Sequence, residues 1–217
     1  MAQGHGLSVL VRAAQITGEK RFWDAAHLAL KPFTQAGFLF DSLNPSSDWL
    51  NLHKSIKPSQ DAKDGGVRNK FMNQHTWYEE YPFSDGLYVL NGFMYSMIGL
   101  YDLLSADGAP EELQLTAKEI FDVGFQSLKV KFREEMLKKF PSRFQKMLPL
   151  YDNGKGTNYD MRHYIKSIAP NRARWDYHVV HVHQLNLFKS IFRDEKIFSE
   201  FASRWHGYIN GHYADHN

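Results

Sequence analysis

Hydrophobic and polar positions recur with the period of α-helices along most of this chain. Near its start the apolar positions fall three and four residues apart, at Leu7, Leu10, Val11 and Ala14. This spacing places them on one face and predicts a helix over 6–16. After a break at Thr17 and Gly18 the same pattern predicts a second helix over 19–30. We therefore expect a helix pair joined by a short turn.

Three further segments complete the helical pattern. Residues 89–104 are apolar nearly all round, which is typical of a buried helix. Pro110 followed by two glutamates opens the next helix, which runs to about Lys129, with acids at its positive end. A final pair is expected over 175–188 and 196–208. Strand-like alternation is scarce, so the fold class is all-α: an α/α toroid, or partial α/α barrel, of antiparallel helix pairs with functional loops.

The polar stretches between these helices hold most of the reactive side chains. Residues 41–66 form a polar loop whose length, unusual in a compact domain, indicates a functional segment or an insertion. Residues 71–82 are aromatic and acidic, and residues 152–157 are rich in turn formers.

Composition narrows the function classes. The 217 residues allow one sizeable core or at most two small ones. A formal net charge of +2 provides no global field for nucleic acid, and the absence of cysteine excludes disulfides and thiol nucleophiles. Apolar runs fall short of membrane-spanning length, so no membrane contact is expected. The aromatic content of 15% suits buried rings and a carbohydrate cleft alike.

Three strings carry a family resemblance. They are FMNQHTWYEEYP at 71–82, VLNGFMYS at 89–96 with GLYD at 99–102, and YDMRH at 159–163 with IAPNRARWDYH at 168–178. The opening residues 2–4 and the closing residues 215–217 fit as well. End to end, the chain resembles the heparosan-N-sulfate-glucuronate 5-epimerase family.

The resemblance implies that residues 1–217 are the C-terminal catalytic domain of an epimerase. Such enzymes invert C5 of D-glucuronate to L-iduronate in heparan sulfate and heparin precursor chains, so the expected partner is heparosan or N-sulfated heparosan. Known members act as homodimers in the Golgi lumen without a cofactor. They carry a membrane anchor and β-rich domains before the helical one, so Met1 is expected to be an internal methionine of a truncated product or partial gene prediction.

One segment departs from the family pattern. The family runs almost directly from the position of Lys129 to that of Met147, whereas residues 130–145 intervene here and are rich in Lys, Arg and Phe. Two interpretations remain open: a short retained intron read in frame, or a genuine amphipathic surface helix.

Epimerisation at C5 sets the chemical requirements of the site. A weakly acidic proton next to a carboxylate leaves, and another returns on the opposite face. This needs a base, an acid, and cations or donors around the sugar carboxylate. Because neighbouring acids repel each other, we expect the pKa of Glu79 or Glu80 to be raised toward neutrality, which would make that residue a usable base. A phenol, with a pKa of about 10, suits reprotonation of a carbanion.

The resemblance assigns the catalytic roles. Glu80 and Tyr81 match the active-site pair of the family, and Tyr159 and Tyr177 are its other phenols. We assign Glu80 as one acid/base and Tyr177 as its partner on the other face, with hydrogen-bonding help from Tyr81 and Tyr159. The reverse assignment of Glu80 and Tyr177 fits the sequence equally well.

Arg162 matches the arginine that binds the sugar carboxylate in the family. The other expected substrate-binding residues are Gln3, Asn91, Tyr95, Asn171, Arg172, Arg174, Trp175 and His178. Guanidinium groups suit carboxylate and sulfate, and an indole suits a sugar face. Ordinary structural roles are also open: an arginine-capped helix start for 171–178, and an internal hydrogen bond for Asn91.

Three other interpretations concern the function of the chain. His178, His181 and His183 suggest a metal, but on a helix His181 and His183 diverge and no nearby acid completes a set, so no metal site is expected. A uronate polysaccharide lyase shares the toroid and the first proton abstraction, but then expels the 4-O-linked sugar. The chain is alternatively an inactive fragment, or one that only binds glycosaminoglycan.

Overall fold

The computed structural model of this protein describes residues 1–34, 66–71, 75–82, 86–129 and 147–214. The polar loop 41–66, except for Gly66, and the basic segment 130–145 lie outside the described residues. The alternatives for these two segments therefore stay predictions.

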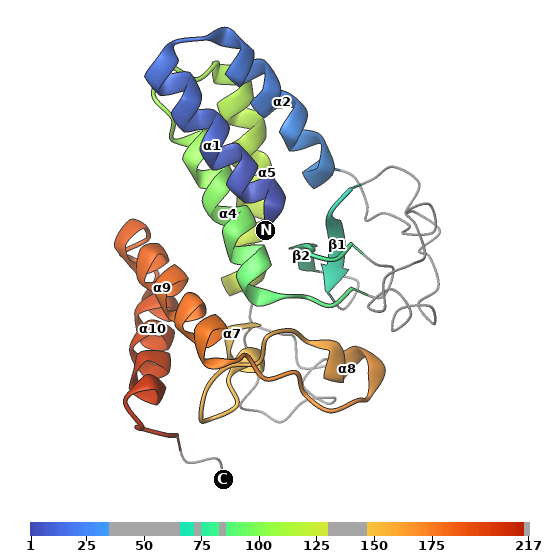
Figure 1. The fold of residues 1–217 in the computed structure, drawn as a ribbon, viewed down its shortest axis with the longest axis vertical. Helices are drawn as coiled ribbons and strands as arrows, with labels where there is room; N and C mark the ends of the chain where they lie inside the picture. Colours follow the sequence, from blue (N-terminus) through green and yellow to red (C-terminus); the bar gives the residue numbers. More distant parts are fainter. Residues whose placement is uncertain (35–65, 72–74, 83–85, 130–146, 215–217) are drawn as a thin grey trace.

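Four helices pack together in the first half of the chain. They are α1 (Ala2–Thr17), α2 (Lys20–Thr34), α4 (Leu90–Leu104) and α5 (Glu111–Lys129), and they form the upper part of Figure 1. Helix α1 packs against α2 and α4, and α4 packs against α5. Gly18 ends α1 in the left-handed conformation and donates its N–H to Ala14 O at 2.8 Å. The predicted helices over 6–16, 19–30, 89–104 and 110–129 are confirmed.

Helix α4 lies at the centre of this group. Ten of its 15 residues are buried, as its apolar sequence predicts. It approaches α1 so closely at Gly99 that a Cβ there would lie 2.1 Å from Gly4 O. Only glycine, which has no Cβ, fits at this position. This crossing places the start of α1 beside the middle of α4, at Tyr95, Ser96 and Gly99.

A second helix pair forms the other side of the molecule. Helix α9 (Trp175–Ile191) packs against α10 (Lys196–Ile209) and also contacts α4. Both were predicted at nearly these bounds. Two short helices, α7 (Met147–Tyr151) and α8 (Arg162–Lys166), were not predicted, because five residues are too few to show a helical period.

A β-hairpin is the main departure from the helical prediction. Strands β1 (Arg68–Phe71) and β2 (His75–Tyr78) pair antiparallel, with Asn69 opposite Trp77. The two last residues of β2, Trp77 and Tyr78, are both buried, so the strand lacks the alternation that would have marked it. Strand β2 packs against α5 and α4, and the chain leaves it directly into Glu79 and Glu80.

Aromatic rings anchor the hairpin to the helical core. Trp77 stacks on Phe93 with ring centroids 3.9 Å apart, and the Tyr78 hydroxyl donates to Ile120 O at 2.6 Å. Apart from this hairpin the described elements are helices, and the all-α class is confirmed. Closure of the pairs into a toroid stays a prediction. None of the helices in the described ranges has both the length and the apolar composition needed to cross a membrane.

Candidate active site

Two adjacent glutamates after β2 occupy different environments. Glu79 is 2% exposed, and its carboxylate accepts hydrogen bonds from the backbone N–H groups of Tyr88, at 3.0 Å, and Leu87, at 3.4 Å. The side chain of Asn69 also donates to it, at 3.4 Å. Burial raises the pKa of Glu79 to about 8, although these hydrogen bonds act in the opposite direction.

Glu80 lies against the first turn of α4. A Cβ at Gly92 would be 2.6 Å from Glu80 Oε2 and 2.8 Å from its Cβ, so a glycine at this position makes room for the carboxylate. Burial raises the pKa of Glu80, while the amino terminus and hydrogen bonding by Tyr159 and Tyr81 lower it. Glu80 Oε2 is buried and has no hydrogen-bond partner among the described residues. A desolvated carboxylate of this kind is a stronger base than a hydrated one.

Three phenols complete the group. Tyr81 and Tyr159 are partly buried beside Glu80, where burial, followed by the charge of Glu80, raises the pKa of both. Tyr177 lies in the first turn of α9, and its ring contacts that of Tyr159 edge-on at 4.8 Å. The four residues predicted as catalytic therefore come together from three segments of the chain.

Backbone hydrogen bonds hold these segments in register. Tyr159 O accepts from Leu90 N at 3.1 Å, which ties it to the start of α4. On the other side, Tyr159 N donates to Asn171 O at 2.7 Å, and Ala173 N donates to Thr157 O at 2.8 Å. The extended segment before α9 thus runs beside Tyr159 and delivers Tyr177 to it.

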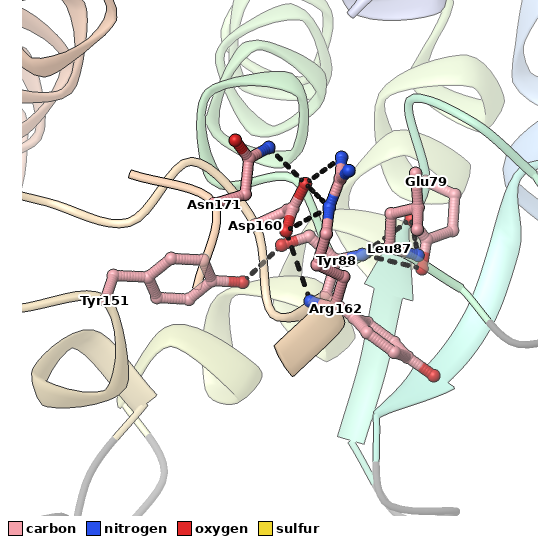
Figure 2. A network of polar contacts seen from close by, with 7 residues as sticks. All are labelled: Glu79, Leu87, Tyr88, Tyr151, Asp160, Arg162 and Asn171. Carbon is pink, nitrogen blue, oxygen red and sulfur yellow. Dashed lines mark hydrogen bonds and ion pairs between the residues drawn. The ribbon is translucent and has the colours of Figure 1, made fainter. Parts of the chain in front are cut away.

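Arg162 lies in a polar network with Asp160, which Figure 2 shows. Its Nε is 2.7 Å from Asp160 Oδ2 and its Nη2 is 2.5 Å from the same oxygen, while the Asn171 amide donates to that oxygen at 2.8 Å. Asp160 is fully buried. Sequence reasoning did not single out this aspartate, although its place two residues before Arg162 in the string YDMRH was the available signal.

Arg172, Arg174 and Trp175 form an exposed surface beside Tyr177. The Trp175 side chain is 71% exposed, and Arg174 is the N-cap of α9. Neither arginine forms an ion pair within the part of the chain that the structure describes. These side chains are available to an anionic ligand.

His178 is held inside the protein. Its Nε2 lies 3.0 Å from Trp205 O, and its Nδ1 lies 3.1 Å from the Thr157 hydroxyl. Because a carbonyl only accepts, Nε2 carries the proton. The structure gives both ring nitrogens a protein partner, so direct substrate binding by His178 would require one of these contacts to open.

The neighbouring His181 shares the same hydroxyl, with its Nδ1 2.8 Å from Thr157 Oγ1. Its burial lowers the pKa to about 3, so it is neutral. His183 is exposed. Among the described residues, no group of three or more His, Asp or Glu side chains is arranged as a metal site.

The remaining predicted substrate-binding residues lie around α1 and α4. Asn91 is buried next to Gly92; its backbone carbonyl accepts from Gln184 Nε2 at 2.9 Å, and its Oδ1 has no partner within the described ranges. The Tyr95 ring lies 4.3 Å from the ring of His5. Gln3 lines a cavity of about 400 Å³ together with both glutamates and Ser96. Glu80 thus borders the phenols and this cavity.

Comparison with known proteins agrees with the resemblance drawn from the sequence. The family described as D-glucuronyl C5-epimerase C-terminus matches residues 46–207. A D-glucuronyl C5-epimerase of Caenorhabditis elegans is 41% identical over 224 residues, which cover the whole of this chain. The chain spans 29% of the length of that relative. A family match over most of the chain, together with this identity, shows that the chain belongs to the D-glucuronyl C5-epimerase family.

Proposed function

We propose that this chain carries the acid/base site of an epimerase that inverts C5 of D-glucuronate to L-iduronate within heparosan or N-sulfated heparosan. The observation that carries the proposal is the convergence of Glu80 with Tyr81, Tyr159 and Tyr177. A desolvated carboxylate can abstract the C5 proton, and a phenol can return one.

Glu80 is the proposed base. Because burial raises its pKa, the carboxylate gains more from taking a proton than a hydrated glutamate would. Hydrogen bonds from Tyr81 and Tyr159 keep it oriented and ionised before the sugar arrives. The C5–H bond breaks, the proton passes to a Glu80 oxygen, and the electron pair delocalises into the sugar carboxylate.

Tyr177 is the proposed acid on the opposite face. Its hydroxyl delivers a proton to C5, and the phenolate that results recovers a proton from solvent, which the exposed position of Tyr177 allows. Protonated Glu80 then releases its proton to solvent, which returns both groups to their starting states. The reverse reaction exchanges the roles of Glu80 and Tyr177. Tyr159, edge-on to Tyr177, lies between the two groups and supports both.

Removal of the C5 proton adds a second negative charge to the sugar carboxylate, and positively charged groups nearby stabilise this dianion. Asp160 engages Nε and Nη2 of Arg162, which fixes the guanidinium plane, and Nη1 makes no hydrogen bond to a described residue. We assign Nη1 to the sugar carboxylate. Arg172 and Arg174 would bind carboxylates or N-sulfates of neighbouring sugars, and Trp175 would stack on a sugar ring.

The oligomeric state and the compartment of this protein are proposed from the family resemblance alone. On that ground we propose that it acts as a homodimer in the Golgi lumen.

The test is deuterium incorporation at C5 of N-sulfated heparosan incubated with the 217-residue chain in D₂O. Label at C5, with iduronate appearing, supports the proposal. Glu80→Gln should abolish both signals, and Glu119→Gln, an exposed glutamate in the middle of α5, is the matched control. Ultraviolet absorbance of an unsaturated uronate would identify a lyase instead. A folded sample that binds heparosan without labelling it would leave only a glycosaminoglycan-binding fragment.

A further inference from the structure

Glu79 is a buried carboxyl group that the proposed proton transfers do not use. Its two oxygens face the turn at 86–89, where Leu87 and Tyr88 donate their backbone N–H groups to it. Gly86 has a φ of +63°, and a Cβ there would lie 2.5 Å from Glu79 Oε1. The turn is therefore shaped around this carboxylate.

The turn also includes an unusual backbone conformation. Tyr88 has a φ of +55°, which non-glycine residues adopt only when surrounding contacts enforce it. Three contacts do so: Tyr88 N donates to Glu79, its hydroxyl donates to Lys70 O at 3.2 Å, and its carbonyl accepts from the Tyr151 hydroxyl at 2.5 Å. The first of these is the only one made by a charged or ionisable acceptor.

The other side of the same turn holds the segment that contains Tyr159. Leu87 O accepts from Met161 N at 2.9 Å, and three residues later Leu90 N donates to Tyr159 O at 3.1 Å. Figure 2 shows Glu79 on one side of Leu87 and Tyr88, and Asp160 with Arg162 on the other. Glu79 and the Tyr159 segment are therefore bonded to opposite edges of one turn.

We propose that Glu79 is a positioning residue: it holds the turn 86–89, to which the Tyr159 segment is bonded, and so sets the position of Tyr159 relative to Glu80. The inference rests on the proposed function, because the separation matters only if these two groups share a substrate. Glu79 acts through the backbone, because it is 2% exposed and both of its oxygens are bonded to N–H groups.

The ionisation of Glu79 fits this role. Burial raises its pKa to about 8, so near neutral pH it stays protonated and adds no second negative charge beside Glu80. The titratable groups that face it are Asp160, Tyr151, the amino terminus and its neighbour Glu80. Glutamine, a neutral amide, should therefore substitute for the protonated Glu79, whereas alanine should not.

The test compares Glu79→Gln and Glu79→Ala by C5 exchange. Glu79→Ala should lower kcat about 10²-fold, the effect of displacing reacting groups by about 1 Å, with a small change in KM. Glu79→Gln should restore most of kcat and remove the loss of activity as the pH rises past 8. Leu113→Ala, a buried change at the far end of α5, is a control that lowers stability without altering kcat or the pH profile.

Three results would overturn the inference: an unchanged kcat in Glu79→Ala, a change confined to KM, or an equal loss in Leu113→Ala. If the wild-type chain itself shows no C5 exchange, the proposed function fails, and the positioning role is decided by amide hydrogen exchange. Faster amide hydrogen exchange confined to residues 87–90 and 159–161 in Glu79→Ala supports the positioning role. Exchange there that matches Leu113→Ala refutes it.

Discussion

The ring of Tyr159 contacts the ring of Tyr177 edge-on, with centroids 4.8 Å apart and planes inclined by 72°. The two tyrosines differ in environment: Tyr159 is partly buried next to Glu80, whereas Tyr177 is 38% exposed. Together they connect a desolvated carboxylate to the protein surface. An acid that must recover its proton from solvent is expected at the exposed end of this connection.

Tyr177→Phe should therefore remove activity without loss of stability. We expect C5 exchange to fall by about 10²- to 10⁴-fold, the usual contribution of one acid/base group. Because Tyr177 is an exposed residue, the free energy of unfolding should change by no more than about 0.5 kcal/mol. Tyr101→Phe, which removes a phenol hydroxyl from an aromatic cluster on α4, is the control and should match wild type in both measurements. Retained exchange in Tyr177→Phe would assign the acid to another group.

Gly92→Ala tests the position of Glu80. The new Cβ would lie 2.6 Å from Glu80 Oε2 and 2.8 Å from its Cβ, so the glutamate must move. Overpacking costs about 1–3 kcal/mol, which is partly offset by a helix-propensity gain of up to about 1 kcal/mol. The larger effect should be on kcat, which we expect to fall about 10²-fold.

Gly6→Ala is the matched control for this prediction. Gly6 lies inside α1, and a Cβ there would meet no atom within 4 Å. The substitution should raise the free energy of unfolding by about 0.5–1 kcal/mol and leave the exchange rate unchanged. Equal kcat in the two alanine variants would show that Gly92 does not position Glu80.

The main helices could be predicted because their apolar residues repeat over many turns. Helix α4 is an example, since its buried residues extend along its length from Leu90 to Leu103. The hairpin could not be predicted because its strands have four residues each, and β2 ends in two successive buried aromatics, Trp77 and Tyr78. Short elements whose stability comes from tertiary packing leave little periodic signal.

For the site, the sequence located the residues but not their partners. Glu80 and the three tyrosines were chosen by family resemblance, and the structure brings them together; their catalytic roles stay predictions. The string YDMRH places Asp160 two residues before Arg162, but it does not specify the backbone conformation that brings the two side chains into contact. His178 illustrates the same point, because its partners, Thr157 and Trp205, lie on separate segments.

Glu79 should make stability depend on pH. Its pKa is about 8 in the folded protein against 4.5 in the unfolded chain, so the folded state holds a proton that the unfolded state releases. Between these values the free energy of unfolding falls as the pH rises, by at most about 1.4 kcal/mol per unit. Its stabilising contribution is complete below pH 4.5 and is lost as the pH passes 8.

Glu79→Gln should remove this dependence. Urea unfolding from pH 5 to 8 should show the variant gaining stability relative to wild type as the pH rises. His181, whose pKa falls from 6.5 to about 3, has the opposite effect: its contribution is present above pH 6.5 and is lost toward pH 3. That effect is common to both proteins and cancels in their difference. Parallel pH profiles would show that Glu79 is ionised in the folded state.

Thr157→Val should destabilise the packing of α9. The Thr157 hydroxyl bonds to Nδ1 of both His178 and His181, and the variant has the same shape without this group. Leaving buried polar atoms unpaired costs about 1–3 kcal/mol, which should appear in the free energy of unfolding. Thr157→Ser keeps the hydroxyl and should retain most of the stability. The prediction fails if the valine variant is as stable as the serine variant.

Arg172→Ala and Arg174→Ala should weaken substrate binding without slowing the chemistry. Both guanidinium groups are exposed and make no ion pair to a described residue, so they are free to bind carboxylate or sulfate. Each should raise KM roughly threefold to tenfold, in line with a net hydrogen-bond contribution of about 0.5–1.5 kcal/mol, and leave kcat unchanged. Added salt should shrink the difference from wild type, because exposed charges are screened. Arg193→Ala removes an equal charge from the far end of α9, so a rise in KM there too would indicate a general charge effect.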